Sequence, residues 1–180
     1  RMAAGRCSIV VAPAASASLR CEKAQFYRQL AVTVKKDDEI GLDDLAAHLE
    51  SAGYSRRDPV QMEGEYSIRG GIFDVFPAES HQPVRIEFFG DLVESLRRFD
   101  PETQRSVLKI EEVTLLPLEE TPRTREVLAG AAELASVMDT APGEIFPGWE
   151  FYAAMDRART ATLEDLLDSP LVVWDEPEEL

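Results

Sequence analysis

The feature that most constrains the fold of this chain is a run of short segments, between residues 59 and 117, in which apolar and polar residues alternate. Alternation with a period of two puts every second side chain on a buried face, as in a half-buried β-strand. The segments cover residues 60–62, 65–69, 71–76, 84–89, 93–99 and 107–116. Gly70-Gly71 and Gly90-Asp91 separate neighbouring segments in the way that hairpin turns do. The pattern therefore predicts an antiparallel meander.

A helix is predicted over residues 42–52, before the meander. Its apolar residues follow helical spacing and form one stripe, made by Leu42, Leu45, Ala46 and Leu49. Asp43 and Asp44 lie in its first turn, where carboxylates interact favourably with the helix dipole, and Gly53 follows its end. We expect this helix to cover one face of the sheet, which gives an α+β fold with α/β layering.

The two ends of the chain carry short continuous apolar runs, at residues 8–13 and 171–174. Such runs are typical of strands buried on both faces, and the two could pair in one small parallel sheet. Residues 30–34 are expected to form a further strand. A helix is predicted from Thr121-Pro122 to about Asp139, a loop over 140–149 and a short helix over 162–167.

The charge of the chain is strongly acidic, with a formal net charge of −15. Counted by segment, the net charge is +3 over residues 1–23, −7 over 24–117 and −11 over 118–180. An acidic surface repels the phosphate backbone, so sequence-independent binding to nucleic acid would need a local basic patch. The acidity otherwise favours solubility and basic partner surfaces.

The numbers of cysteines and histidines and the hydropathy of the chain bear on disulfides, metal sites and membrane association. The chain has two cysteines, Cys7 and Cys21, and two histidines, His48 and His81, so we expect reduced thiols in a cytoplasmic protein and no metal site. No apolar run approaches the ~20 residues that span a bilayer, so no membrane association is expected. The start Arg1-Met2 suggests a piece of a longer protein.

Motifs for catalysis are absent from the sequence. There is no Lys-bearing P-loop, no G-x-G-x-x-G, no H-E-x-x-H and no G-x-S-x-G. The acidic clusters lack a partner base or metal-ligand spacing, so we interpret them as solvated surface. We predict that this chain is not an enzyme and binds no cofactor.

Basic residues interrupt the acidic chain in one stretch, from Gly53 to Pro77. Gly70-Gly71 is interpreted there as a turn or bulge between strands. For Arg69 two readings stay open. It either forms an ion pair with Asp74 or Glu65 on the same sheet, or it is an exposed anchor at a protein interface, where arginine is enriched.

The string GEYSIRGGIFDVFP, followed by PVRIEFFGDLVESLRRFDPETQRS, closely resembles the module shared by the excision-repair protein UvrB and the transcription-repair coupling factors. The ending FDPETQRS resembles the coupling factors more. The resemblance covers residues 8–117 well and residues 118–180 loosely. It implies a domain, here residues 24–117, that binds UvrA. In that family the domain is inserted into a helicase-like host, here residues 1–23 and 118–180, and in the coupling factors this host has lost its nucleotide-binding motif.

The resemblance also implies which residues contact UvrA. Arg69 matches the arginine of the family's R-G pair, and Arg56 or Arg57 matches the arginine after G-Y. The arginine that UvrB carries two positions before Arg69 is Ser67 here. Phe73 is either an apolar anchor or a core residue, since alternation alone does not say which face is buried. The candidate partner-binding residues are Arg69, Arg56, Arg57, Phe73, Gly70 and Tyr66.

Three functions are therefore weighed. In the first, the chain is a docking module that recruits UvrA to stalled RNA polymerase in nucleotide excision repair, within an ATP-dependent DNA translocase whose polymerase and DNA contacts lie elsewhere. In the second, it is a DNA-binding module that uses Arg97-Arg98 and Arg56-Arg57. In the third, it is a residual ATPase, against which the missing P-loop argues.

Overall fold

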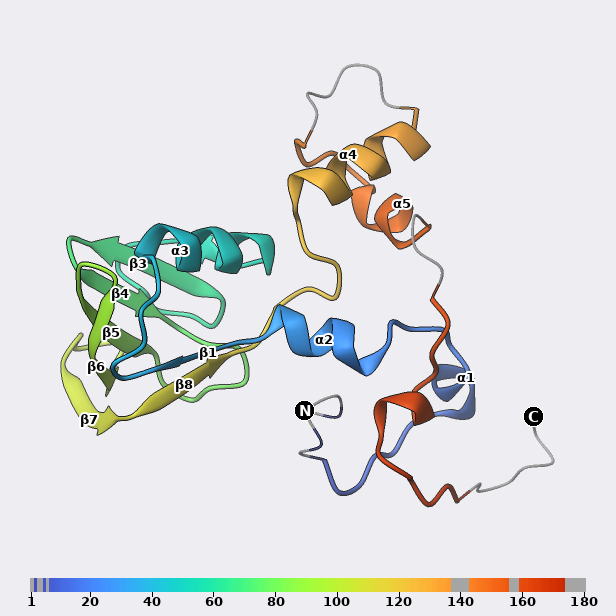
Figure 1. The fold of residues 1–180 in the computed structure, drawn as a ribbon, viewed down its shortest axis with the longest axis horizontal. Coiled ribbons are helices and arrows are strands. Elements are labelled where there is room, and N and C mark those ends of the chain that lie inside the picture. Colours follow the sequence, from blue (N-terminus) through green and yellow to red (C-terminus); the bar gives the residue numbers. More distant parts are fainter. Residues whose placement is uncertain (1, 3–4, 6, 137–142, 156–158, 174–180) are drawn as a thin grey trace. The chain divides into compact units, whose positions relative to one another are not determined.

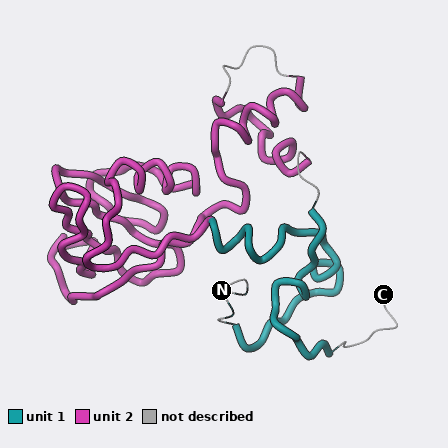
Figure 2. The backbone as a smooth tube through the Cα atoms, in the orientation of Figure 1, with its two compact units in different colours: residues 1–29, 157–180 teal, residues 30–156 magenta. Residues whose placement is uncertain are grey.

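The computed structural model describes residues 2, 5, 7–136, 143–155 and 159–173 (Figure 1). The chain divides into two compact units (Figure 2). Residues 1–29 with 157–180 form the first, and residues 30–156 form the second. Compared with the division expected from the sequence, the first break comes at residue 30 instead of 24, and residues 118–156 group with the sheet.

The second unit is built around a six-stranded sheet with the strand order β2-β3-β4-β5-β6-β7. Its strands are β2 (Ser55–Arg56), β3 (Glu65–Arg69), β4 (Ile72–Val75), β5 (Val84–Phe89), β6 (Leu92–Phe99) and β7 (Ser106–Ile110). Every pair from β3 to β7 is antiparallel and joins strands that are consecutive in sequence. The predicted meander and the α+β fold are therefore confirmed.

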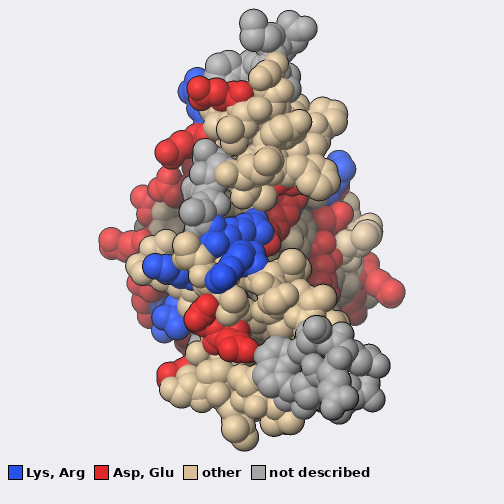
Figure 3. Space-filling model, turned by 90° about the vertical axis from the view of Figure 1, so that its right-hand side faces the viewer, with Lys and Arg blue, Asp and Glu red and all other residues tan. Residues whose placement is uncertain are grey.

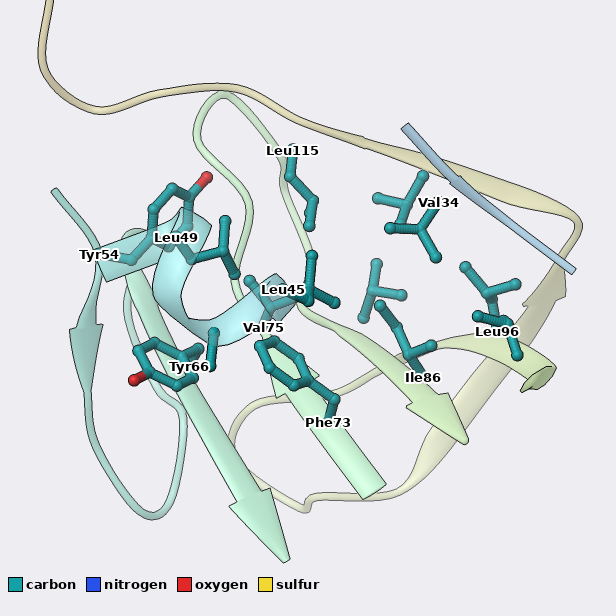
Figure 4. Close-up of a cluster of buried hydrophobic side chains, with 14 of the residues drawn as sticks. Val34, Leu45, Leu49, Tyr54, Tyr66, Phe73, Val75, Ile86, Leu96 and Leu115 are labelled. Atoms are coloured by element: carbon teal, nitrogen blue, oxygen red, sulfur yellow. The ribbon is translucent and has the colours of Figure 1, made fainter. Parts of the chain in front are cut away.

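Helix α3 (Leu42–Ser51) covers one face of this sheet, as predicted (Figure 1). Its residues Leu45, Ala46 and Leu49 are buried. They share one hydrophobic core with side chains of the sheet, including Tyr66, Phe73, Val75, Val84, Ile86, Val93 and Leu96 (Figure 4). The helical stripe and the strand alternation thus meet in a single core, which fixes the layer order.

Residues 107–116, expected as one strand, form two. β7 pairs with β6, whereas β8 (Glu112–Leu115) pairs with β1 (Val32–Lys35) in a separate two-stranded sheet. The change of partner occurs at Glu111, whose carbonyl accepts a hydrogen bond from the Lys36 amide at 2.9 Å. The apolar positions change phase here, from Leu108 and Ile110 to Val113 and Leu115, so the sequence does carry a mark of the change of partner.

The strand predicted over residues 60–62 is wrong. The first strand of the sheet is instead β2, which pairs in parallel with β3. Val60 is buried, but in a small cluster with Phe76 and Phe99 outside the main core. The Glu65 carboxylate accepts hydrogen bonds from the Gln61 and Met62 amides at 2.9 and 3.0 Å. These side-chain bonds fold the segment as a loop in place of a backbone ladder.

A helical hairpin follows the sheet, formed by α4 (Arg125–Leu134) and α5 (Trp149–Met155). Thr124, not Thr121, is the N-cap, because its hydroxyl accepts the Val127 amide at 3.3 Å. Helix α5 was not predicted, and the expected helix end near Asp139 lies outside the described residues. The two helices share a core of Val127, Leu128, Ala131, Phe146, Trp149 and Ala153.

The first unit contains α1 (Ala14–Ala17), α2 (Ala24–Leu30) and the 3₁₀ turn η2 (Glu164–Leu166). Cys21 and Ala161 form an isolated antiparallel bridge. The strand predicted at 8–13 is wrong, and so is the one at 171–174 as far as it is described, to residue 173. Ile9 and Val11 are 81% and 93% exposed, because no described strand lies beside them to bury a two-sided apolar run.

Candidate protein-docking site

The candidate site is organised by the turn between β3 and β4. Arg69, the last residue of β3, pairs in register with Ile72, so Gly70 and Gly71 form the two-residue connection. Gly70 has a φ of +61°, a backbone conformation that favours glycine. At Gly71 a Cβ atom would lie 2.6 Å from the Phe88 carbonyl oxygen on β5. The two glycines thus serve different purposes, one for the turn and one for close strand contact.

A buried carboxylate, Asp74 on β4, holds the Arg69 side chain. Arg69 Nη2 lies 2.6 Å from Asp74 Oδ2, and the Asp74 side chain is 1% exposed while that of Arg69 is 44% exposed. Ser67 is opposite Asp74 in the β3–β4 register, and alternation then puts Ser67, Arg69 and Asp74 on the same face of the sheet. This is the face opposite α3. The first of the two readings of Arg69, the ion pair with Asp74, is confirmed, and its guanidinium still reaches solvent.

Asp74 has a second arginine partner, Arg85 on β5. Arg85 donates from Nε to Asp74 Oδ1 at 2.7 Å and from Nη2 to Asp74 Oδ2 at 2.8 Å, which is a bidentate contact. The Arg85 guanidinium also lies 4.8 Å from the centre of the Phe99 ring. The hydrogen bond to Asp74 raises the pKa of Arg85, so this arginine stays charged. Arg85 alone therefore provides a hydrogen bond to each oxygen of the buried Asp74 carboxylate.

A second carboxylate, Asp58, lies on the solvent side of Arg69. Arg69 Nη1 is 3.6 Å from Asp58 Oδ1, and the Asp58 side chain is 58% exposed. Asp58 and Arg85 were not among the residues predicted for the site. Alternation placed Arg85 on the polar face of β5, so a search for arginines across the strand from Asp74 would have found it. Asp58 lies in an irregular loop, where the sequence gives no such signal.

The structure separates Arg56 from Arg69. Arg56 pairs in register with Tyr66, and residues in register point to the same face of a sheet, so Arg56 lies on the α3 side. Arg57 is exposed and donates its amide to the Tyr66 carbonyl at 2.8 Å. Arg56 therefore lies on the other face of the sheet from Arg69, and a contact of Arg56 or Arg57 with UvrA stays a prediction.

Tyr66 and Phe73, two of the predicted contact residues, are core residues instead. They are 1% and 0% exposed and stack on each other with ring centres 5.4 Å apart (Figure 4). The Tyr66 hydroxyl donates to the carboxylate of Glu50 on α3. Burial, that hydrogen bond and the Glu50 charge raise the pKa of Tyr66 to about 12. Neither side chain can touch a partner in this structure, because α3 and the sheet enclose both.

Ser67, where UvrB carries an arginine, is 3% exposed, and its hydroxyl has no hydrogen-bond partner among the described residues. Of the predicted contact residues, the exposed ones are therefore Arg69, Gly70, Arg56 and Arg57.

The arginines considered for DNA binding are tied to other groups. Arg97 lies 3.5 Å from the Glu87 carboxylate, and Arg98 Nη1 lies 3.5 Å from the Ser80 hydroxyl. As neighbours on one strand, Arg97 and Arg98 point to opposite faces of the sheet. Figure 3 shows one face of the molecule, with a group of Lys and Arg side chains near its middle and carboxylates mainly toward its sides. Arg97 and Arg98 thus do not form one basic patch with each other, as phosphate binding by this pair would need.

Metal sites and membrane-spanning helices can also be checked in the described part of the chain. It contains no group of three or more His, Cys, Asp or Glu residues that could hold a metal ion. Within the same residues, no helix is long and apolar enough to cross a membrane. The geometry supports recognition by charge and hydrogen bonding around Arg69.

Comparison with known proteins shows which family and which proteins this chain resembles. Residues 32–120 match the family described as the UvrB interaction domain. The transcription-repair-coupling factor of Bacillus subtilis is 36% identical over 133 residues, which are 74% of this chain and 11% of that protein. That of Myxococcus xanthus is 41% identical over 108 residues, 60% of this chain and 9% of that protein. The UvrABC system protein B of Thermosipho africanus is 27% identical over 128 residues, 71% of this chain and 19% of that protein. The chain spans about a tenth of the length of the coupling factors that it matches.

Proposed function

The chain belongs, through residues 32–120, to the UvrB interaction domain family, and on this premise we propose that it docks the repair protein UvrA. Its similarity to coupling factors supports a role as a module of transcription-repair coupling. In the longer protein, docking would bring UvrA to a stalled RNA polymerase. Translocation on DNA and contact with the polymerase would reside outside these residues.

One observation supports the proposal most directly: a half-exposed arginine is fixed by a buried acid at the tip of a rigid hairpin. Long side chains usually lose conformational entropy when they enter an interface. Arg69 has already lost part of that freedom, because Asp74 holds one side of its guanidinium at 2.6 Å. The planar guanidinium can then offer its remaining donors to a carboxylate of the partner in a defined direction.

The surrounding charge favours a protein partner over DNA. The net charge of −15 repels phosphate, whereas one oriented arginine in an acidic surface can still recognise a single carboxylate on UvrA. Charge complementarity of this kind mainly sets orientation and association rate. We therefore expect UvrA binding that weakens with added salt.

The test is a calorimetric titration of UvrA into the chain at moderate salt. Arg69→Ala should weaken binding by about 2 kcal/mol or more if Arg69 is a hot spot. Arg105→Ala is the matched control, since Arg105 is also an exposed arginine of the sheet unit but lies at the start of β7. Equal affinities of wild type and folded Arg69→Ala would refute a docking role for Arg69, and absence of wild-type binding would refute the function itself.

A further inference from the structure

The Arg69 cluster contains two arginines and one buried acid, so one positive charge is left over. Arg85 contacts both oxygens of Asp74, at 2.7 and 2.8 Å, and neutralises that carboxylate. Arg69 reaches the same carboxylate through Nη2 only. Together the three side chains carry a net charge of +1, located on the guanidinium that is 44% exposed. Asp58, at 3.6 Å from Nη1, is the acid that balances it.

The contact between Asp58 and Arg69 is weak compared with the others in the cluster. A separation of 3.6 Å is too long for a hydrogen bond, and both side chains are largely open to water. Exposed ion pairs with this geometry contribute little, because water screens the charges and both side chains lose conformational freedom. Asp58 can therefore leave Arg69 at small cost.

Asp58 nevertheless stays close to Arg69, because the loop that carries it is fastened to the sheet. The Arg57 amide donates to the Tyr66 carbonyl at 2.8 Å, just before Asp58. After it, Val60 is 1% exposed, and its carbonyl accepts a hydrogen bond from Gln104 Nε2 at 3.2 Å. A carboxylate tethered in this way competes with any external carboxylate at a high effective concentration.

From these observations we infer that the solvent side of Arg69 is a carboxylate-binding position, that Asp58 occupies it weakly in the free protein, and that an Asp or Glu side chain of the partner displaces Asp58 on docking. The inference rests on the proposed function, and it adds an internal competitor that sets the affinity. A partner carboxylate can form the bidentate, hydrogen-bonded contact that Asp58 does not form. Asp58 thereby restricts the site to partners able to make that better contact.

The experiment compares two variants that each remove one negative charge. Asp58→Asn removes the competitor and keeps the shape of the side chain. Glu94→Gln, at an exposed position on β6, is the control for general charge. In UvrA titrations Asp58→Asn should bind roughly two- to fivefold more tightly than wild type. Glu94→Gln should change the affinity far less, and Asp58→Asn should give no gain when Arg69→Ala is already present.

A second measurement does not depend on UvrA. The NMR signal of the Arg69 Nε–H group is followed while sodium acetate is added at constant ionic strength. We expect this signal to shift and to saturate at a roughly two- to fivefold lower acetate concentration in Asp58→Asn than in wild type or Glu94→Gln. An Arg69 signal that ignores acetate, or responds equally in all three proteins, would overturn the inference. If UvrA does not bind but this acetate difference is seen, the carboxylate position stands and the proposed function fails.

Discussion

Arg85 binds both carboxylate oxygens of Asp74, at 2.7 and 2.8 Å, whereas Arg69 binds only one of them. Asp74 is 1% exposed, and a buried carboxylate without a partner is strongly destabilising. Because Arg85 remains when Arg69 is replaced, we expect Asp74 to keep a partner and the protein to stay folded. In the proposed function, Arg69 is then the arginine that docks UvrA.

We therefore predict that Arg85→Ala lowers the free energy of unfolding by about 3 kcal/mol, since it leaves the buried Asp74 with a single, half-exposed partner. Arg69→Ala should cost about 1 kcal/mol or less. Urea denaturation followed by far-UV circular dichroism measures both. Equal losses for the two variants would show that Arg69, too, is needed to neutralise Asp74.

The two glycines of the β3–β4 turn give a second prediction. Gly71→Ala should destabilise the protein by roughly 2 kcal/mol, because its Cβ would lie 2.6 Å from the Phe88 carbonyl oxygen and would push β4 from β5. In Gly70→Ala the added Cβ has no atom within 4 Å. The variant should lose only about 1 kcal/mol, because alanine disfavours the positive φ of this position. Thermal unfolding of both variants checks the order. A more stable Gly71→Ala than Gly70→Ala would contradict the strand contact described above.

Tyr66 gives a prediction for alkaline pH. Burial and the hydrogen bond to Glu50 raise the pKa of Tyr66 to about 12, above the ordinary value of 10.0. Between these values the folded state keeps the hydroxyl proton that the unfolded state loses. The contribution of Tyr66 to the free energy of unfolding is therefore complete below pH 10 and disappears as the pH rises to about 12. The loss is at most about 1.4 kcal/mol per pH unit.

The measurement for Tyr66 is urea denaturation at several pH values between 9 and 12, for wild type and Tyr66→Phe. The variant should be less stable near neutral pH by about 1 kcal/mol, for the lost hydrogen bond to Glu50. The difference between the two proteins should then shrink above pH 10 and change sign before pH 12, because the wild type loses up to about 1.4 kcal/mol per pH unit. A constant difference over the whole range would show that Tyr66 does not titrate differently in the folded state.

The sequence was sufficient where structure depends on local patterns. The hairpins of β3 to β6 follow from alternation and glycine turns, and α3 follows from its stripe and acidic first turn. The strands predicted for the two apolar runs near the chain ends were wrong, because these runs depend on partners that are not local. A run such as 8–13 becomes a strand only beside other strands, and partners that are distant in sequence leave no local mark.

The site was predicted only in part, because alternation defines two faces of a sheet without saying what covers each. Phe73 and Asp74 are adjacent on β4 and point to opposite faces, yet both are buried. Part of the second face is covered by Phe76 and Phe99, which alternation puts on the Asp74 side and which pack with Val60 in a small cluster. Val60 comes from a loop, so the strand pattern alone did not show that this face is covered.

The last prediction distinguishes a core role of Phe73 from a docking role. Phe73→Ala should lower the free energy of unfolding by about 3–5 kcal/mol, because the side chain is 0% exposed and stacked on Tyr66. Phe73→Leu keeps most of the volume and should cost less, about 1.5 kcal/mol. The Leu variant should therefore remain folded at 15 °C and can be compared with wild type in UvrA binding.

If Phe73 serves only the core, folded Phe73→Leu binds UvrA as wild type does, while Arg69→Ala, equally folded, does not. The two measurements separate the contributions because a stability defect lowers binding only through the unfolded fraction, which cooling reduces. Circular dichroism at the temperature of the titration verifies that both variants are folded. Weak binding by a fully folded Phe73→Leu would mean that the side chain leaves the core on docking, and the core assignment would then hold for the free protein alone.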